Sequence, residues 1–111
     1  MDSEIKVLLY DVLNSILEIE SFLDEDYSFE HYTSDIKTKR AVERNFEIIG
    51  EAINRILKRD NDFEISDSRK IISLRNRIIH VYDTVSDELM WSIIQNYLPV
   101  LEMEVRKYLE E

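Results

Sequence analysis

The feature that most constrains the fold of this chain is its near lack of residues that break helices. The 111 residues contain one glycine, Gly50, and one proline, Pro99. A β-sheet protein of this length needs several turns, and turns depend heavily on glycine and proline. A chain with so few of them can instead form long helices joined by short connections. We therefore predict an all-α fold.

Apolar residues recur at three- and four-residue spacings along four segments, as they do on one face of an amphipathic helix. The predicted helices run from Ser3 to about Leu23, from about Thr33–Asp35 to about Leu57, from Ser66–Ser68 through Arg69 to about His80, and from Ser86 to Leu109. Polar segments separate them, the first being residues 24–28. This pattern predicts an up-down bundle of about four to five helices. The length predicts a single domain over residues 1–111.

A few positions within these helices carry local expectations. Ser3 should cap the first helix, and Asp67–Ser68 should cap the third. Gly50 lies inside the second helix, where glycine costs roughly 1 kcal/mol relative to alanine. We expect it there because it lets a neighbouring helix approach closely. Pro99 lies inside the fourth helix and should bend it.

The composition excludes several classes of chemistry. The chain has no cysteine, which excludes disulfides, a thiolate nucleophile and a cysteine-based zinc site. No Asp, His and Glu residues are grouped at the spacing of metal ligands, so we expect neither a metal nor another cofactor. No apolar run approaches the roughly 20 residues that span a membrane. Residues 1–4 lack the basic stretch of a signal peptide, which favours a cytoplasmic location.

Charge is distributed unevenly along the chain, whose net charge is −10. Residues 69–80 contain four basic residues and no acidic one, which leaves the other 99 residues with 10 basic and 24 acidic side chains, a charge of −14. An acidic body opposes general binding of nucleic acid. A local basic segment can still accept RNA at one site, while the acidic surface can attract a basic partner.

One arginine in this basic segment lies at a position of its helix where an apolar residue is expected. Arg75 falls within the apolar arc of the third predicted helix, and a buried guanidinium without a partner costs several kcal/mol. Two interpretations remain open. A carboxylate on the second helix pairs with the arginine, the candidates being Glu43, Glu47 and Glu51. Alternatively, the arc faces a dimer cleft in which the arginine meets phosphate.

The end of the same helix carries the chain's other candidate groups. A histidine at the position of His80 is either a surface residue or an acid–base group. Asn76 lies one helical turn before it on the same face. Tyr82, taken alone, would be a core aromatic whose hydroxyl reaches water. The second histidine, His31, lies in a polar linker with no chemical partner evident in the sequence.

Taken together, these residues form a recognisable pattern. Arg75 is followed after four residues by His80, and after one more residue by Tyr82. This pattern resembles the signature of the HEPN ribonucleases, and the form that carries the tyrosine is similar to that of the HepT-like family.

The resemblance extends over about residues 36–109. Residues 43–52 resemble the family's second-helix motif, which centres on Ile-Gly-Glu-Ala. Three residues match its last helix: Trp91, Leu98 and Pro99. The chain departs from the family pattern before the arginine, where members often carry Pro-Trp and this chain has Asp67–Ser68.

The resemblance implies a homodimer with an active cleft at the subunit interface and metal-independent endonuclease activity on RNA, with no action on DNA expected. In this chemistry the ribose 2′-hydroxyl attacks the adjacent phosphorus and leaves a 2′,3′-cyclic phosphate. Arg75 would stabilise the charge on the phosphate, and His80 would act as general acid or base. Asn76 would orient His80, and Arg77 would bind a flanking phosphate.

The resemblance also implies a regulatory partner. Similar proteins are toxins paired with a minimal nucleotidyltransferase antitoxin, which transfers AMP to the motif tyrosine. In this chain that residue is Tyr82. A bulky anionic adenylate beside Arg75 and His80 would occupy the phosphate site and repel RNA.

The sequence leaves open both the geometry of the site and the choice of function. Positions five apart on a helix differ by about 140°, so Arg75 and His80 do not share a face. Either a two-fold axis brings Arg75 of one chain to His80 of the other, or the helix unwinds and His80 turns inward.

The alternative function is a non-catalytic helical module that dimerises and binds a nucleotidyltransferase, with Tyr82 only as the acceptor of AMP. A third possible function is that of a nucleotide-binding domain that uses Arg75 and Arg77 to bind phosphate.

Overall fold

The protein is helical throughout its regular structure. The computed structural model describes residues 1–80 and 84–110, and within these ranges it contains no β-strand, which confirms the predicted all-α fold. In chain order the elements are α1 (Ser3–Phe22), α2 (Phe29–Ser34), α3 (Ile36–Arg59), α4 (Ser68–Ile79), α5 (Asp87–Ser92), the π-helical turn η1 (Ile93–Tyr97) and α6 (Leu98–Glu110). None of the helices in the described ranges is both long and apolar enough to cross a bilayer.

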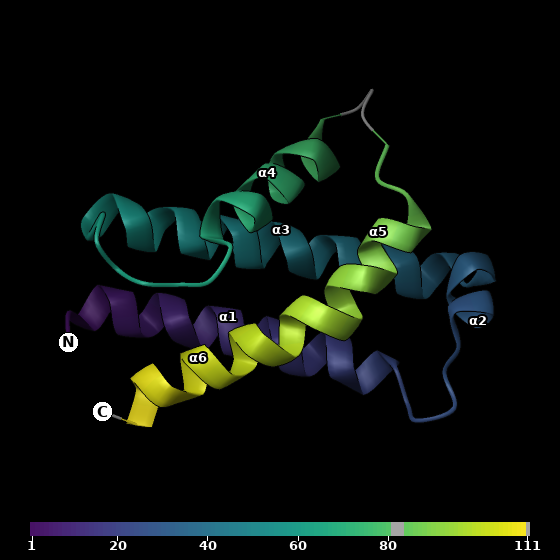
Figure 1. The fold of residues 1–111 in the computed structure, drawn as a ribbon, viewed down its shortest axis with the longest axis horizontal. Helices are drawn as coiled ribbons and strands as arrows, with labels where there is room; N and C mark the ends of the chain where they lie inside the picture. Colours follow the sequence, from purple (N-terminus) through teal and green to yellow (C-terminus); the bar gives the residue numbers. More distant parts are fainter. Residues whose placement is uncertain (81–83, 111) are drawn as a thin grey trace.

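The long helices form an up-down bundle. Helices α1 and α3 run antiparallel and side by side, α4 packs on α3, and α6 crosses α1 (Figure 1). The N- and C-terminal ends lie at the same end of the molecule (Figure 1). Helix α4 projects from the bundle because its contacts with other helices are with α3 (Figure 1). The segment that carries the motif therefore depends on α3 for its placement.

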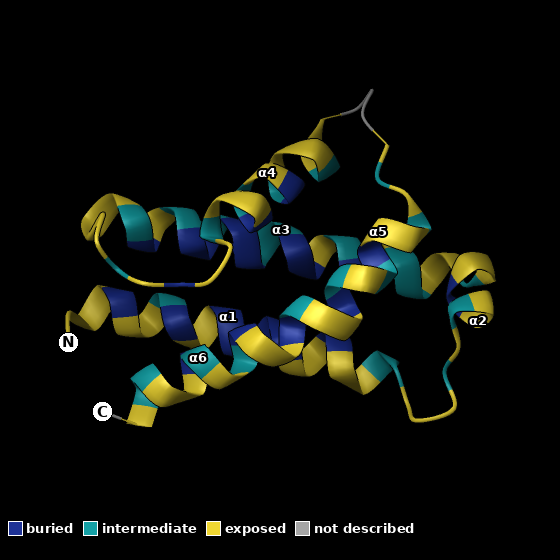
Figure 2. Cartoon of the chain, viewed as in Figure 1, coloured by how far each residue is buried: buried dark blue, intermediate teal, exposed yellow. Residues whose placement is uncertain are grey.

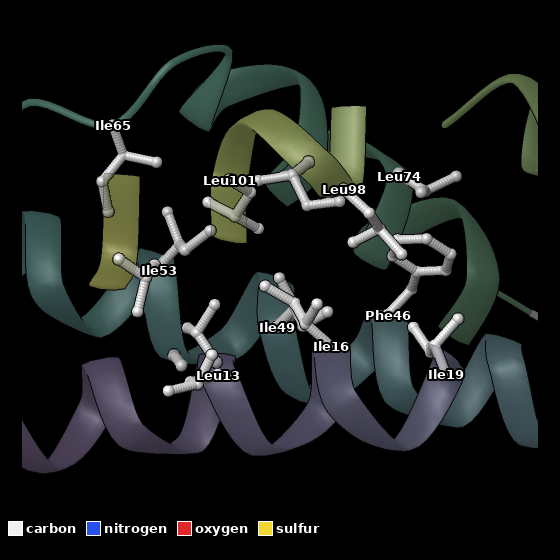
Figure 3. Packing of buried hydrophobic residues seen from close by; sticks show 14 of the residues in the cluster. Leu13, Ile16, Ile19, Phe46, Ile49, Ile53, Ile65, Leu74, Leu98 and Leu101 are labelled. Atoms are coloured by element: carbon white, nitrogen blue, oxygen red, sulfur yellow. The ribbon is translucent and has the colours of Figure 1, made fainter. Parts of the chain in front are cut away.

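The core is built from the apolar faces of α1, α3 and α6. Figure 2 shows the buried positions turned toward the bundle interior and the exposed ones turned outward, as the spacing of apolar residues predicts. In Figure 3 these side chains point toward one another: Leu13, Ile16 and Ile19 of α1, Phe46, Ile49 and Ile53 of α3, and Leu98 and Leu101 of α6. Burying each such side chain contributes roughly 1.5–3 kcal/mol, so the bundle is held mainly by this layer.

Gly50 lies where α3 and α4 approach each other closely. A Cβ atom added at Gly50 would lie 2.4 Å from the Cβ atom of Arg75 and 3.2 Å from the carbonyl oxygen of Ile71. No side chain fits into that space, so the expectation that Gly50 allows a close helix approach is confirmed. The residue that occupies the space is the motif arginine itself.

Two predicted helix caps are wrong. Helix α1 is capped by Asp2 rather than Ser3, since the Asp2 carboxylate accepts hydrogen bonds from the backbone N–H of Glu4 at 2.8 Å and of Ile5 at 3.2 Å. At α4, Asp67 has a left-handed backbone (φ 53°) and its side chain makes no capping hydrogen bond, while Ser68 is already the first helical residue. A capping residue normally has an extended backbone that aims its side chain at the helix.

The segment just before α4 is held by contacts with α6 and η1 instead. Ser66, two residues before the helix, donates its backbone N–H to Glu104 at 3.0 Å, and its hydroxyl also bonds to that carboxylate. The hydroxyl of Tyr97 donates to the carbonyl of Ser66 at 2.8 Å. The entry to α4 is thus fixed by residues about 30 to 40 positions away in sequence, which local patterns cannot reveal.

Helix α2 was not predicted from the sequence. It is capped by Ser28, whose hydroxyl accepts from the backbone N–H of His31 at 3.0 Å. Its buried Tyr32 packs against Trp91 with ring centroids 5.6 Å apart. Six residues are too few to show an apolar period, so only the tertiary contact identifies this helix.

The distortion expected at Pro99 takes the form of the π-helical turn that precedes it. The N–H of Leu98 donates to the carbonyl of Ile93, five residues earlier. Proline has no N–H to donate and its ring crowds the carbonyl four residues before it. A wider turn at this point lets the helix continue into α6 without that clash.

The α1–α6 contact contains two interacting carboxyl groups. Burial and a hydrogen bond with Glu102 raise the pKa of Glu20 to about 7. The same hydrogen bond, with a contribution from Arg106, lowers the pKa of Glu102. Arg106 donates to Glu102 at 2.9 Å. Below about pH 7 the pair therefore holds one proton, which resides mainly on Glu20.

We expect Gly50→Ala to lower the free energy of unfolding by roughly 1–2 kcal/mol. Overpacking costs about 1–3 kcal/mol, and an approach of 2.4 Å to the Cβ atom of Arg75 argues for the upper half of that range. The gain of about 1 kcal/mol in helix propensity offsets only part of this cost. Urea denaturation followed by circular dichroism measures the change. Lys37→Ala, an exposed substitution on the same helix, should stay within about 0.5 kcal/mol of wild type. Equal stability of the two variants would show that α4 can shift away without cost.

We expect Glu20→Gln to stabilise the protein at pH 8 but not at pH 4.5. The pKa of Glu20 is raised from its ordinary 4.5 to about 7 in the folded state. The folded state is therefore penalised as pH rises through this window, and the penalty is complete above it. Glutamine is uncharged and can still donate to Glu102. Urea unfolding at both pH values tests this, with Glu25→Gln in the exposed linker as control. The same stability gain at both pH values would contradict the proton-sharing pair.

Candidate active site

Arg75 leaves α4 on the side that faces α3. Its Nη2 atom lies 2.9 Å from Oε2 of Glu51, and its Nη1 atom donates to Oδ1 of Asn76 at 2.9 Å. The arginine side chain is 27% exposed. The interpretation that a second-helix carboxylate pairs with this arginine is confirmed, and the partner is Glu51. More than a quarter of the side chain still faces solvent, so an incoming anion can reach the guanidinium.

The other two candidate carboxylates lie along the same helix. Glu43 pairs with Arg40 one turn earlier, at 2.8 Å. Glu47 lines the same surface depression as Glu51 and Arg75. The pairing with Glu51 agrees with the position of its neighbour Gly50, where α4 approaches α3 too closely to leave room for a Cβ atom.

The depression beside Arg75 has a volume of about 270 Å³. It is formed by the exposed faces of α1, α3 and α4, and it combines charged with apolar side chains. Its lining residues are three arginines (Arg44, Arg55 and Arg75), three carboxylates (Asp11, Glu47 and Glu51) and three apolar residues (Leu8, Ile48 and Ile79). Three guanidinium groups so close together form a surface that can contact phosphate.

Glu51 contacts two of these arginines at once. Its Oε2 atom pairs with Arg75, and its Oε1 atom lies 2.9 Å from Nε of Arg55. Sequence reasoning missed Arg55 as a member of the site. The available signal was the four-residue spacing of Glu51 and Arg55 on one helix, but nothing in the sequence links that pair to α4.

His80 is the residue at which α4 ends. Its backbone is extended (φ −83°, ψ 119°), its N–H donates to the carbonyl of Arg77 at 3.3 Å, and the residue is exposed. The helical offset of 140° therefore does not fix its direction relative to Arg75. The helix does end at this residue, as one of the two alternatives requires. Which subunit's Arg75 it serves stays a prediction.

Arg77 faces a different part of the surface. Its Nη2 atom donates to the carbonyl of Thr84 at 2.8 Å, which joins the last turn of α4 to the segment before α5. It also lines a groove of about 500 Å³ between α4 and the η1–α6 helix. Lys70 lies on the same wall, and Ser92 and Asn96 lie on the opposite one. A flanking phosphate at Arg77, as predicted from the resemblance, would bind on this side.

Tyr82, the predicted site of modification, lies outside the described residues. His31 lies in α2 and not in a polar linker as predicted. It stacks on Tyr27 with ring centroids 4.3 Å apart and lies 3.8 Å from the carboxylate of Asp35, and neither contact is evident in the sequence. Hydrogen bonds from Thr38 and Tyr27 lower the pKa of that carboxyl group. This cluster holds α2 in place.

The fold and the site define a class of protein: a small helical bundle in which an arginine and a histidine occupy the end of one helix. A family model described as ribonuclease HepT-like matches residues 12–108. The chain belongs to this HepT-like ribonuclease family, which confirms the resemblance seen in its motifs.

Individual relatives agree with this assignment. The chain is 30% identical over 110 residues to a protein named as an RNase from Methanocaldococcus jannaschii, covering 97% of this chain and 89% of the relative. It is 34% identical over 106 residues to a protein named as ribonuclease HepT from Thermococcus cleftensis, covering 92% and 93%. A third relative, named as an RNase from Caldanaerobacter subterraneus, is 33% identical over 106 residues, covering 89% and 92%. No solved structure matches the chain significantly.

Proposed function

We propose that this protein is the toxin of a toxin–antitoxin pair and a metal-independent endoribonuclease. The observation that carries the proposal is the placement of Arg75 in the motif of a ribonuclease family, with its guanidinium paired and its side chain partly exposed. A catalytic arginine needs both pairing and exposure, because the ion pair fixes the orientation of its guanidinium group while the exposed part of the side chain meets the substrate.

In the proposed reaction the 2′-hydroxyl of one ribose attacks the adjacent phosphorus. The P–O bond to the 5′-oxygen of the next nucleotide breaks, and a 2′,3′-cyclic phosphate remains. His80 removes the proton from the attacking hydroxyl or supplies one to the leaving oxygen, which an imidazole can do near neutral pH. Arg75 stabilises the charge that develops on the phosphate. Asn76 accepts a hydrogen bond from Arg75 and so helps to orient its guanidinium group, in addition to its predicted role of orienting His80.

The active unit in this proposal is a homodimer. Helix α4 packs on α3 and leaves Ile79, the last helical residue before His80, 46% exposed. An exposed apolar side chain within the motif is suited to a subunit interface. A two-fold axis close to α4 would place Arg75 and His80 of both chains around one cleft.

The proposed partner is a small nucleotidyltransferase that modifies Tyr82 with AMP. An adenylate near Arg75 would compete with RNA phosphate for the same guanidinium, since both are anionic phosphate esters. The antitoxin would thereby neutralise the nuclease without unfolding it.

The net charge of −10 favours a second candidate, a non-catalytic module that dimerises and docks a nucleotidyltransferase. An acidic surface suits a basic protein partner better than it suits RNA. The two functions differ in one measurable respect, because only the nuclease cleaves RNA when purified alone.

We expect Arg75→Ala and His80→Ala each to reduce cleavage by at least about a hundred-fold, the typical loss on removing an electrostatic stabiliser or an acid–base group. The assay incubates the purified chain with single-stranded RNA in the presence of EDTA and identifies the cyclic phosphate end by mass spectrometry. Circular dichroism and size-exclusion chromatography show whether each variant stays folded and dimeric.

The control for both variants is Arg106→Ala, which removes an exposed arginine from α6 and should cleave like wild type. Undiminished cleavage by His80→Ala would refute the assignment of the acid–base group. An inactive wild-type chain in this assay would favour the docking module.

We expect coproduction with the cognate nucleotidyltransferase to add one or more AMP units to the wild-type chain and none to Tyr82→Phe. Intact-mass spectrometry detects the addition, and the modified chain should no longer cleave RNA. Tyr10→Phe, which changes an exposed tyrosine on α1, serves as the matched control and should still be modified. AMP on Tyr82→Phe would place the acceptor elsewhere.

A further inference from the structure

The Glu51 carboxylate links the motif arginine to a second arginine outside the motif. Each of its oxygens pairs with a different guanidinium, Oε2 with Arg75 and Oε1 with Arg55, both at 2.9 Å. Two cations that contact opposite oxygens of one carboxylate lie close together. They can then contact one phosphate, or two neighbouring phosphates of the same strand.

Arg55 is well placed to meet a ligand that also reaches Arg75. Its side chain is 63% exposed, against 27% for Arg75. Both arginines line the same depression on the surface of α1, α3 and α4. Arg44, three turns earlier on α3, lines the other end of this depression. The arginines on α3 therefore extend the site away from the motif along the axis of that helix.

The charge balance of the depression limits what it can bind. Three arginines face Asp11, Glu47 and Glu51, so the depression is neutral overall while the whole chain carries −10. An anion must compete with Glu51 for the guanidinium groups. A ligand that offers phosphates to both arginines at once competes better than a single phosphate does, because its second contact forms within the same complex. This favours a polynucleotide strand.

A purely structural explanation of Arg55 does exist. Arg55 and Glu51 are four residues apart on an exposed helix, and such pairs are common surface ion pairs. The same arrangement occurs on α6, where Arg106 pairs with Glu102 at 2.9 Å and is 49% exposed. The difference is that Glu51 also holds Arg75. Arg106 is therefore a matched control that keeps the ion-pair geometry and lacks the link to the motif.

We propose that Arg55 is a phosphate-binding residue of the nuclease site, held beside Arg75 by their shared carboxylate. It contacts the RNA backbone at a phosphate next to the one that Arg75 contacts. The ligand class is single-stranded RNA, and the contact adds binding energy without taking part in the bond-breaking step. This inference rests on the proposed nuclease function for its substrate.

The test compares Arg55→Gln with Arg106→Gln in two assays. The first measures binding of a short 2′-O-methyl RNA, which cannot be cleaved, as a function of salt concentration. Loss of one phosphate contact should make the dependence of log affinity on log salt shallower by about 0.7 for a single strand. The second assay measures cleavage, where Arg55→Gln should raise KM and leave kcat unchanged. Arg106→Gln should match wild type in both.

Arg55→Lys separates a phosphate contact from an effect on folding, because it retains the charge and should restore most of the salt dependence. A structural ion pair would instead change the free energy of unfolding and leave the salt slope unaltered. If Arg55→Gln has the same salt slope and KM as wild type, the proposal is wrong. The binding assay does not depend on catalysis. A wild-type chain that binds the probe but cleaves no RNA would therefore refute the nuclease function, and the salt dependence of binding by Arg55→Gln would still test the phosphate contact.

Discussion

The contact between Gly50 and Arg75 is the constraint on which the candidate site depends. Helix α4 packs on α3 alone among the described helices, and at Gly50 the two helices approach too closely to leave room for a Cβ atom. A side chain at that position would collide with the first carbons of Arg75, which then could not pass toward α3. One glycine in the middle of a 24-residue helix thus sets both the position of α4 and the direction of its motif arginine.

Once α4 is placed in this way, the electrostatics of the site follow. Glu51, next to Gly50, meets Arg75 and at the same time holds Arg55, one turn further along α3. Both guanidinium groups are therefore already paired before any ligand arrives, and pairing that limits their motion lowers the entropic cost of binding. They are also neutralised, which weakens the attraction for stray anions. In a strongly acidic chain, an anion-binding site made of arginines requires neighbouring carboxylates that orient the arginines without covering them completely.

Several details show why local sequence patterns were insufficient around this site. The start of α4 has no side-chain cap and is held instead by Ser66, Tyr97 and Glu104, which join it to the last helix. The short helix α2 is fixed by aromatic contacts with Trp91 across the bundle. The π-helical turn before Pro99 follows from the chemistry of proline, yet its exact form depends on how η1 and α6 pack. In each case the deciding partner is far away in sequence.

The sequence by itself determined the all-helical class, the approximate limits of the four long helices and the motif that identifies the family. These properties depend on the helical repeat, on the scarcity of glycine and proline, and on residue order, all of which are local. Only the tertiary structure decided that Glu51 rather than Glu43 or Glu47 pairs with Arg75, and that Arg55 shares this carboxylate. Helical periodicity gives the face on which a residue lies. Which residue it meets depends on where two helices cross, and here that point is set by the one position that lacks a side chain.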